Sequence, residues 1–220
     1  MRLEAVDTAE FVKAATEALE RGGMEQWARQ VGQTWTPRQI CPLLQNDDED
    51  VRKLGCVTLA LCGDQRAVGP LTAALRDASS QVAELAEHAL WSIWFRSSTP
   101  EALKRFRRGL SALADNDLAS AVAQFDAARQ ADPKFTESYN QCAIAHYLAE
   151  RWLESMELSE EALELHPAHF GALAGIGHCQ FQLGNFAEAA RRYRQALAIN
   201  PRMHSVAQAL SRIERCVAAV

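Results

Sequence analysis

The sequence predicts an all-α protein, an α-solenoid in which helical hairpins stack along the chain. Two internal periods predict it. Pro133, Pro167 and Pro201 recur with a 34-residue period, and apolar residues at helical spacing recur with them. A second, 31-residue period runs through the N-terminal part of the chain. Alanine and leucine dominate the apolar residues, a composition that favours helix packing over a sheet.

The 34-residue period covers the C-terminal half of the chain. Three windows aligned on the prolines bring together residues of the same kind at each position: Gly109, Ala143 and Gly177; Ala121, Ser155 and Ala189; Phe125, Ser159 and Tyr193; Ala128, Ala162 and Ala196. Each window predicts a helix, a turn and a second helix. Small residues mark the point where the two helices cross, and the proline marks where the second helix ends.

This pattern resembles the tetratricopeptide repeat family, which implies a right-handed superhelix. Within a domain of residues 101–220, repeats are expected over about 102–134, 135–168 and 169–202, with a capping helix over 203–217. The third repeat matches best, through Leu173, Gly177, Phe181, Gly184, Asn185, Phe186, Ala189, Tyr193, Ala196 and Pro201. The first departs at Arg105 and Arg108 and the second at Ser155 and Ser159. Looser packing is therefore expected in those two repeats.

The 31-residue period lies in a region of residues 1–96. Ile40, Leu44, Val51, Leu54 and Leu59 recur as Leu71, Leu75, Val82, Leu85 and Leu90. With the Gly63-Asp64 turn, this pattern resembles the short HEAT-like repeats of phycobilin lyases and bacterial scaffolds, and two are expected over about 36–95. Asn46, Asp47 or Asp48 can cap the helix that carries Val51.

Residues 7–35 precede these repeats. Phe11, Val12, Ala15 and Leu19 predict an amphipathic helix that ends at Gly22-Gly23. Met24, Trp27 and Val31 predict a shorter helix after it. The pair is either a degenerate first repeat or a cap.

The junction between the arrays holds a cluster of aromatic residues. Thr99 and Pro100 are expected to form the N-cap and first position of the next helix. Trp91, Trp94 and Phe95 come just before them, and such rings are costly to leave in water. They are expected to pack where the two arrays meet, so that one continuous superhelix forms.

Charge and composition exclude several classes of protein. The chain has 23 basic and 28 acidic residues, a net charge of −5, and no positive field that would select nucleic acid. The basic run from Lys104 to Arg108 is interpreted as a solvated helix face. No segment is apolar enough to span a bilayer, and the N-terminus does not resemble a secretory signal. The six cysteines form no CxxC pair, which favours a reducing compartment and a cytoplasmic protein.

No motif of a catalytic, cofactor or metal site is recognised. The acidic run Asp47 to Asp50 lacks the glycine and the alternating ligands of a calcium loop, and it is interpreted as a capped helix start. His166, His169 and the pair His178-Cys179 lack the converging geometry that zinc needs. No catalytic residue, metal or cofactor is therefore predicted.

The resemblance places a concave groove on the first helix of each repeat. Its expected partner-binding residues are Phe106, Arg107, Leu110, Asn140, Gln141, Ile144, His178, Gln208 and Arg212, with room left by Gly171, Ala174 and Gly175. Asn140 and Ile144 lie in the middle repeat and are expected to point away from the hairpin core. Family members that grip C-terminal carboxylates use lysine, arginine and asparagine here. This groove offers only Asn140, Arg107 and Arg212 for that purpose.

The predicted function is a non-enzymatic scaffold or adaptor that holds a peptide or helix of another protein in this groove. The alternative is an accessory subunit of an enzyme, such as a HEAT-repeat chromophore lyase.

Overall fold

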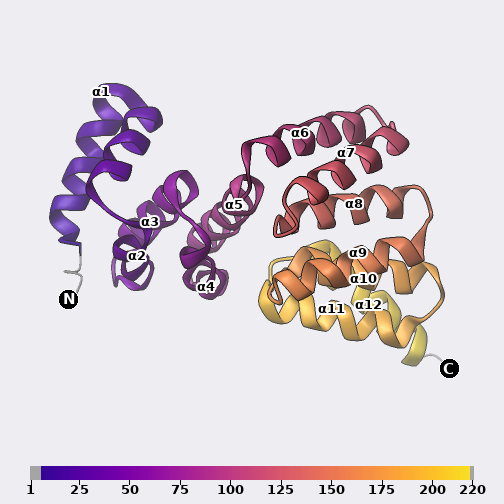
Figure 1. The fold of residues 1–220 in the computed structure, drawn as a ribbon. Helices are drawn as coiled ribbons and strands as arrows, with labels where there is room; N and C mark the ends of the chain where they lie inside the picture. The colour runs from indigo at the N-terminus through magenta and orange to yellow at the C-terminus, as the bar shows by residue number, and fades with distance from the viewer. Residues whose placement is uncertain (1–5, 219–220) are drawn as a thin grey trace. The chain divides into compact units, whose positions relative to one another are not determined.

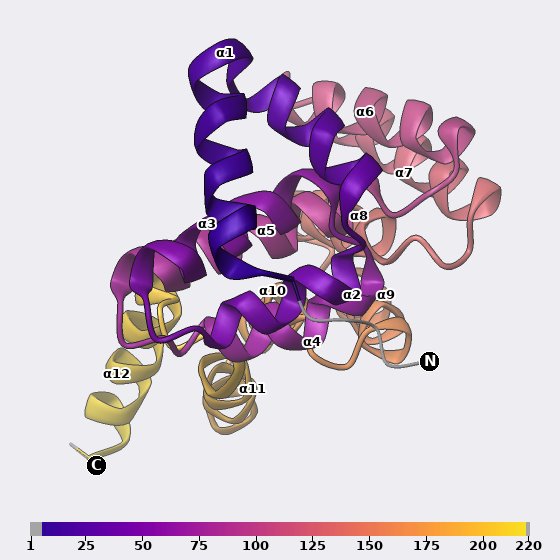
Figure 2. The same ribbon diagram turned by 90° about the vertical axis from the view of Figure 1, so that its left-hand side faces the viewer.

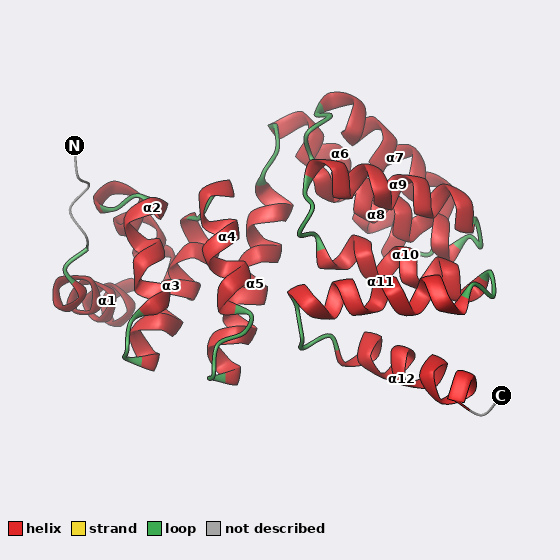
Figure 3. Cartoon of the chain, turned by 90° about the horizontal axis from the view of Figure 1, so that it is seen from below, coloured by secondary structure: helices red, strands yellow, loops and turns green. Residues whose placement is uncertain are grey.

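The computed structural model describes residues 6–218, except for the side chains of Leu19, Gly22, Val217 and Ala218. Predicted core position Leu19 and the end of the predicted capping helix at Val217 thus lie outside the described side chains. Every regular element within that range is a helix, and no strand occurs there (Figure 3). This confirms the all-α prediction. The chain divides into two compact units, Met1–Ile93 and Trp94–Val220.

The N-terminal unit begins with α1 (Thr8–Thr34), which bends sharply at Gly23 (Figure 2). Gly23 has φ 67° and ψ −158°, a conformation that glycine adopts without a steric penalty. The predicted helix end at Gly22-Gly23 is therefore confirmed as a break within α1. Beyond the break, Trp27 is buried and packs against Phe11, with 5.2 Å between ring centroids. Its Nε1 donates to Thr58 Oγ1 over 2.9 Å, which holds α1 to α3 (Glu49–Cys62).

Two helical hairpins follow in this unit. Their elements are α2 (Pro37–Ile40), the 3-10 helix η1 (Cys41–Gln45), α3, α4 (Gln65–Ala74) and α5 (Ser80–Arg96). The first arm is split between α2 and η1, because Pro42 has no N–H to continue the α-helical pattern. Asp48, one of three predicted caps, accepts from Asp50 N and starts α3. An ion pair of 2.8 Å between Arg52 and Asp77 ties α3 to the turn before α5.

The C-terminal unit contains three antiparallel hairpins and a closing helix (Figure 1). The hairpins are α6 (Pro100–Ala114) with α7 (Leu118–Ala131), α8 (Thr136–Leu148) with α9 (Trp152–Leu165), and α10 (Phe170–Gln182) with α11 (Phe186–Ile199); α12 (His204–Ala218) closes the array. As predicted, Thr99 caps α6, through a hydrogen bond of 3.4 Å from Ala102 N, and Pro100 is its first residue.

The turn inside each hairpin repeats in its backbone. Asn116 and Glu150 have φ 59° and Gly184 has φ 78°, and the three occupy the same position of successive repeats. In each turn the N–H of the next residue donates to the carbonyl oxygen five residues earlier, over 2.8–2.9 Å. The three donors are Asp117, Arg151 and Asn185. These bonds satisfy carbonyls that the end of the first helix leaves free.

The predicted close crossings inside the hairpins occur in the first and third repeats. A Cβ atom on Gly109 would lie 2.5 Å from the ring of Phe125, and a Cβ atom on Gly177 would lie 2.5 Å from the ring of Tyr193. Glycine is therefore required at both crossings. Each ring fills the space between the two helices of its own hairpin.

The three aromatic residues near the end of α5 differ in how deeply they are buried. Trp94 is 2% exposed and stacks on His169, with 4.6 Å between ring centroids. Phe95 is 37% exposed and lies 5.8 Å from the ring of Phe106. Trp91 is half-buried. A joint between the two arrays at these rings, and a single continuous superhelix, stay predictions.

Candidate functional site

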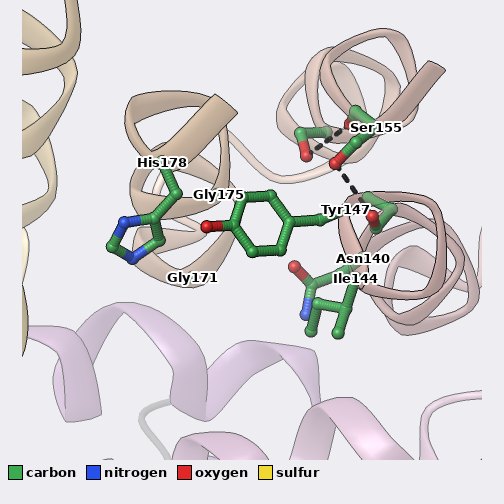
Figure 4. A pocket seen from close by; sticks show the side chains of 9 residues that line it. Asn140, Ile144, Tyr147, Ser155, Gly171, Gly175 and His178 are labelled. Carbon is green, nitrogen blue, oxygen red and sulfur yellow. Dashed lines mark hydrogen bonds between the residues drawn. The ribbon is translucent and has the colours of Figure 1, made fainter. Parts of the chain in front are cut away.

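A small pocket opens between three consecutive helices of the C-terminal unit (Figure 4). Its cavity volume is about 70 Å3. It is lined from α8 by Asn140, Ala143, Ile144 and Tyr147, from α9 by Ser155 and Ser159, and from α10 by Gly171, Gly175 and His178. Sites that enclose a small organic molecule have volumes of about 300–1,000 Å3. This pocket therefore accommodates only a group the size of one small side chain.

The pocket exists because the second repeat lacks an aromatic ring. Phe125 and Tyr193 fill the space between the helices of the first and third hairpins. The residue at the same position of the second repeat is Ser159. A serine side chain leaves most of that space empty, and the glycine of α10 that faces it, Gly175, adds no side chain.

The two serines in the wall direct their hydroxyl groups to the backbone. Ser155 Oγ donates to Ala143 O over 2.8 Å, and Ser159 Oγ donates to Ser155 O over 2.9 Å. Cys179 Sγ in turn donates to Ser155 Oγ over 3.3 Å. Both hydroxyl protons are thus used in structural hydrogen bonds, and neither serine has a histidine or carboxylate as its hydrogen-bond acceptor.

Asn140 is held by a buried chain of polar groups. His169 Nδ1 accepts from Ala172 N over 3.0 Å, so its Nε2 carries the hydrogen and donates to Glu137 Oε1 over 2.7 Å. The other oxygen of Glu137 accepts from Asn140 Nδ2 over 3.3 Å. Because a carboxylate only accepts, the nitrogen of the Asn140 amide must face Glu137. Its oxygen then faces the other way, toward Tyr147, as Figure 4 shows.

His178 is a wall residue from α10, and its ring contacts Tyr193 of α11. His178 Nδ1 lies 2.8 Å from the Tyr193 hydroxyl oxygen. Burial lowers the pKa of His178 and raises the pKa of Tyr193 well above its usual value. Both side chains are therefore neutral at pH 7. Tyr147 accepts a hydrogen bond from Gln182 Nε2 over 3.1 Å, and its ring centroid lies 6.2 Å from that of His178.

The predicted groove residues do not all line one surface depression. Asn140, Ile144 and His178 line the pocket, whereas Gln141 does not line it and donates to Glu137 over 3.3 Å. Gln208 and Arg212 lie along α12 in a second, open depression with His204, Ala207, Ser211 and Arg215.

Three predicted groove residues are less exposed than a partner-binding residue in an open groove would be. Phe106 is only 2% exposed and packs against Phe125 and Phe135, so it belongs to the core. Asn140 is only 4% exposed, and the expectation that it points away from the hairpin core is wrong, because Glu137 draws its amide inward. Leu110 is half-buried against the same core as Phe106. Arg107 is exposed.

Three residues of the site were not predicted from the sequence: Tyr147, Glu137 and His169. Tyr147 lies two helical turns after Asn140 and one turn after Ile144, so helical spacing alone places it on their face. Glu137 and His169 belong to different repeats, and no local pattern connects them.

Residues 6–218 contain no group of three or more histidine, cysteine, aspartate or glutamate side chains that could hold a metal ion. None of the helices described there is both long and apolar enough to cross a membrane.

Comparison with known proteins supports tetratricopeptide repeats in the C-terminal unit. A model of the family described as tetratricopeptide repeat matches residues 147–213. Tetratricopeptide repeat protein 16 of Homo sapiens and that of Macaca fascicularis are each 37% identical to this chain over 78 residues, which is 36% of this chain. The chain covers only 9% of the length of these relatives.

Solved structures share the fold of this unit. The first TPR of Spaghetti (RPAP3) bound to an HSP90 peptide has a TM-score of 0.52 at 19% identity, over 54% of this chain and 94% of that chain. The Sgt2 TPR domain of Aspergillus fumigatus has a TM-score of 0.52 at 19% identity, over 55% of this chain and 81% of that chain. The TPR2B domain of yeast Sti1 in a pHsp70 complex has a TM-score of 0.51 at 16% identity, over 53% of this chain and 98% of that chain. The HEAT-like resemblance of residues 36–95 stays a prediction.

Proposed function

We propose that this chain is a non-enzymatic adaptor that holds a segment of a partner protein against the first helices of its tetratricopeptide repeats. The observation that carries the proposal is the pocket between α8, α9 and α10, where Asn140, Ile144 and His178 come together. A pocket of about 70 Å3 suits one side chain of a polypeptide and is too small for a metabolite.

Two of the structures that share the fold contain such partners. The first TPR of Spaghetti is bound to an HSP90 peptide, and the TPR2B domain of Sti1 is in complex with pHsp70. Their sequence identities to this chain are only 19% and 16%, so they support a peptide partner and do not identify it.

Ile144 offers the sharpest test of this function. Its side chain is 36% exposed at the pocket, so Ile144→Asp introduces a charge into the contact surface without opening the core. The matched control is Leu153→Asp on α9, because Leu153 is 61% exposed and does not line the pocket. Both variants and the unchanged chain serve as baits for affinity purification and quantitative mass spectrometry.

We expect Ile144→Asp to lose the partner that the unchanged chain captures and Leu153→Asp to keep it. A hot-spot residue at the centre of an interface contributes about 2 kcal/mol or more, which is roughly a thirtyfold change in affinity. Capture that survives Ile144→Asp and fails in Leu153→Asp would place the binding surface elsewhere.

A further inference from the structure

Gly175 is a glycine that the packing of this chain does not require. A Cβ atom there would meet only Ser159 Oγ, at 3.5 Å, which is an ordinary contact. By contrast, a Cβ atom on Gly177 would lie 2.5 Å from the Tyr193 ring. Gly175 lies in the middle of α10, where glycine is less favourable than alanine. The absence of a side chain at Gly175 leaves space in the pocket.

Asn140 supplies a second, independent feature of the same pocket. The residue is 4% exposed and lines the pocket, and its Nδ2 is bonded to Glu137. Among the residues that the structure describes, no group donates a hydrogen bond to its Oδ1. Figure 4 shows this oxygen on the side of Tyr147, with the nitrogen on the opposite side. This oxygen is open to the pocket, so a ligand or water there can donate a hydrogen bond to it.

We propose that this pocket takes one small apolar side chain from an internal, extended stretch of a partner protein, whose adjacent backbone N–H donates to Asn140 Oδ1. This inference rests on the proposed function and adds the chemistry of the bound residue. The cavity is about half the size of the roughly 150 Å3 cavity that admits a benzene ring, so the side chain is alanine- to valine-sized.

The orientation of Asn140 also excludes a C-terminal carboxylate at this position. A carboxylate only accepts hydrogen bonds, and the group that Asn140 turns to the pocket is itself an acceptor. The donor half of the amide is held by Glu137, which His169 orients in turn. The partner therefore contributes an N–H group here and need not end at this point of its sequence.

Peptide display on the full chain tests the proposal. One library presents random peptides between two folded domains, so that neither end is free, and the other presents them with a free C-terminal carboxylate. We expect binders from the embedded library, with a small apolar residue enriched at one position. Binders that come only from the library with free C-termini would overturn the inference, as would two libraries without binders.

Two substitutions then locate the contact on the protein. Gly175→Ala fills the pocket and should weaken a selected peptide about tenfold or more, while the matched Gly32→Ala, where a Cβ meets nothing within 4 Å, should have no effect. Asn140→Ala should weaken binding about tenfold. The matched control is Asn185→Ala in the turn before α11, because this exposed amide donates to Gln180 over 2.9 Å and does not line the pocket; it should leave binding unchanged.

An ester in place of the peptide N–H tests the hydrogen bond itself. The ester should weaken binding to the unchanged protein about tenfold and cause no further loss in Asn140→Ala, because both changes remove the same bond. Additive losses would overturn the assignment. If Ile144→Asp abolishes binding but Gly175→Ala and the ester do not, the groove function stands and this inference fails. If Ile144→Asp also has no effect, both fail.

Discussion

His169 Nε2 lies 2.7 Å from Glu137 Oε1, and both side chains are fully buried. The contact joins the first turn of α8 to the residue that caps α10, so it links the second repeat to the third. Trp94 stacks on the imidazole ring, with 4.6 Å between centroids. Because the opposite oxygen of Glu137 holds Asn140, this pair supports both the packing of the unit and the geometry of the pocket.

Removing the carboxylate should destabilise the protein strongly. Glu137→Ala removes a fully buried hydrogen bond of 2.7 Å to His169 Nε2, and we expect a loss of about 2–3 kcal/mol in the free energy of unfolding. The matched control is Glu161→Ala, whose ion pair with Arg129 spans 3.6 Å at the surface and should contribute less than about 1 kcal/mol. Urea denaturation followed by circular dichroism measures both. Equal losses in the two variants would contradict the role of Glu137.

Trp94→Ala should destabilise by about 3 kcal/mol or more, because both the transfer of the ring and the remaining cavity oppose folding. The ring is 2% exposed and contacts His169 and Phe170. Leu153→Ala, at a side chain that is 61% exposed, should change stability by no more than about 0.5 kcal/mol. Thermal and urea unfolding give both values, and a Trp94 variant as stable as the Leu153 variant would refute the prediction.

Two glycines of α10 should respond in opposite directions to the same substitution. Gly175→Ala should stabilise the chain by up to about 1 kcal/mol, since alanine is the better helix former and the site has room. Gly177→Ala should destabilise by about 1–3 kcal/mol, because the new methyl group would overlap the Tyr193 ring. Chemical denaturation of both variants checks the contrast. A loss of stability in Gly175→Ala would contradict the room for a methyl group at this position.

Glu150 carries a backbone strain that glycine would relieve. Its φ of 59° lies in the left-handed region, which costs a side chain other than glycine about 1 kcal/mol. We expect Glu150→Gly to raise the free energy of unfolding by about that amount. Asn116→Gly is the control, since Asn116 has the same φ and asparagine tolerates that region better. An equal gain in both variants would mean that strain at Glu150 is not the cause.

Stability should fall as the solution is acidified from pH 7 to pH 5. Burial lowers the pKa of His146, His166 and His178 below the usual value of about 6.5. The unfolded chain then binds more protons than the folded one, so stability is complete above about pH 6.5 and is lost as the pH falls toward the folded pKa values. Each histidine contributes up to about 1.4 kcal/mol per pH unit in that window.

The variant His178→Gln should show a shallower slope over the same window. Urea denaturation at pH 7, 6 and 5 measures the slope in the variant and in the unchanged chain. Carboxylates with lowered pKa values, such as Asp77, titrate only below about pH 4 and do not affect this range. An unchanged slope would contradict the assignment to His178.

The helical hairpins of this protein, and several of their helix ends, could be predicted from local features of the sequence. Thr99-Pro100 starts α6, Gly23 breaks α1, and the even spacing of Pro133, Pro167 and Pro201 marks successive hairpins. These features are local, because a cap, a break or a helical period depends on residues within one or two turns of each other.

Which side chains of the first helices line the groove and which belong to the core depends on tertiary contacts and could not be predicted from the sequence. Phe106 faces Phe125 and Phe135 because helices on both sides close over it. The amide of Asn140 is turned by Glu137, which is oriented by His169 from the next repeat. The pocket depends on Ser159 and Gly175 from different hairpins. Helical periodicity assigns a residue to a face, whereas its orientation and the space beside it depend on neighbours that are distant in sequence.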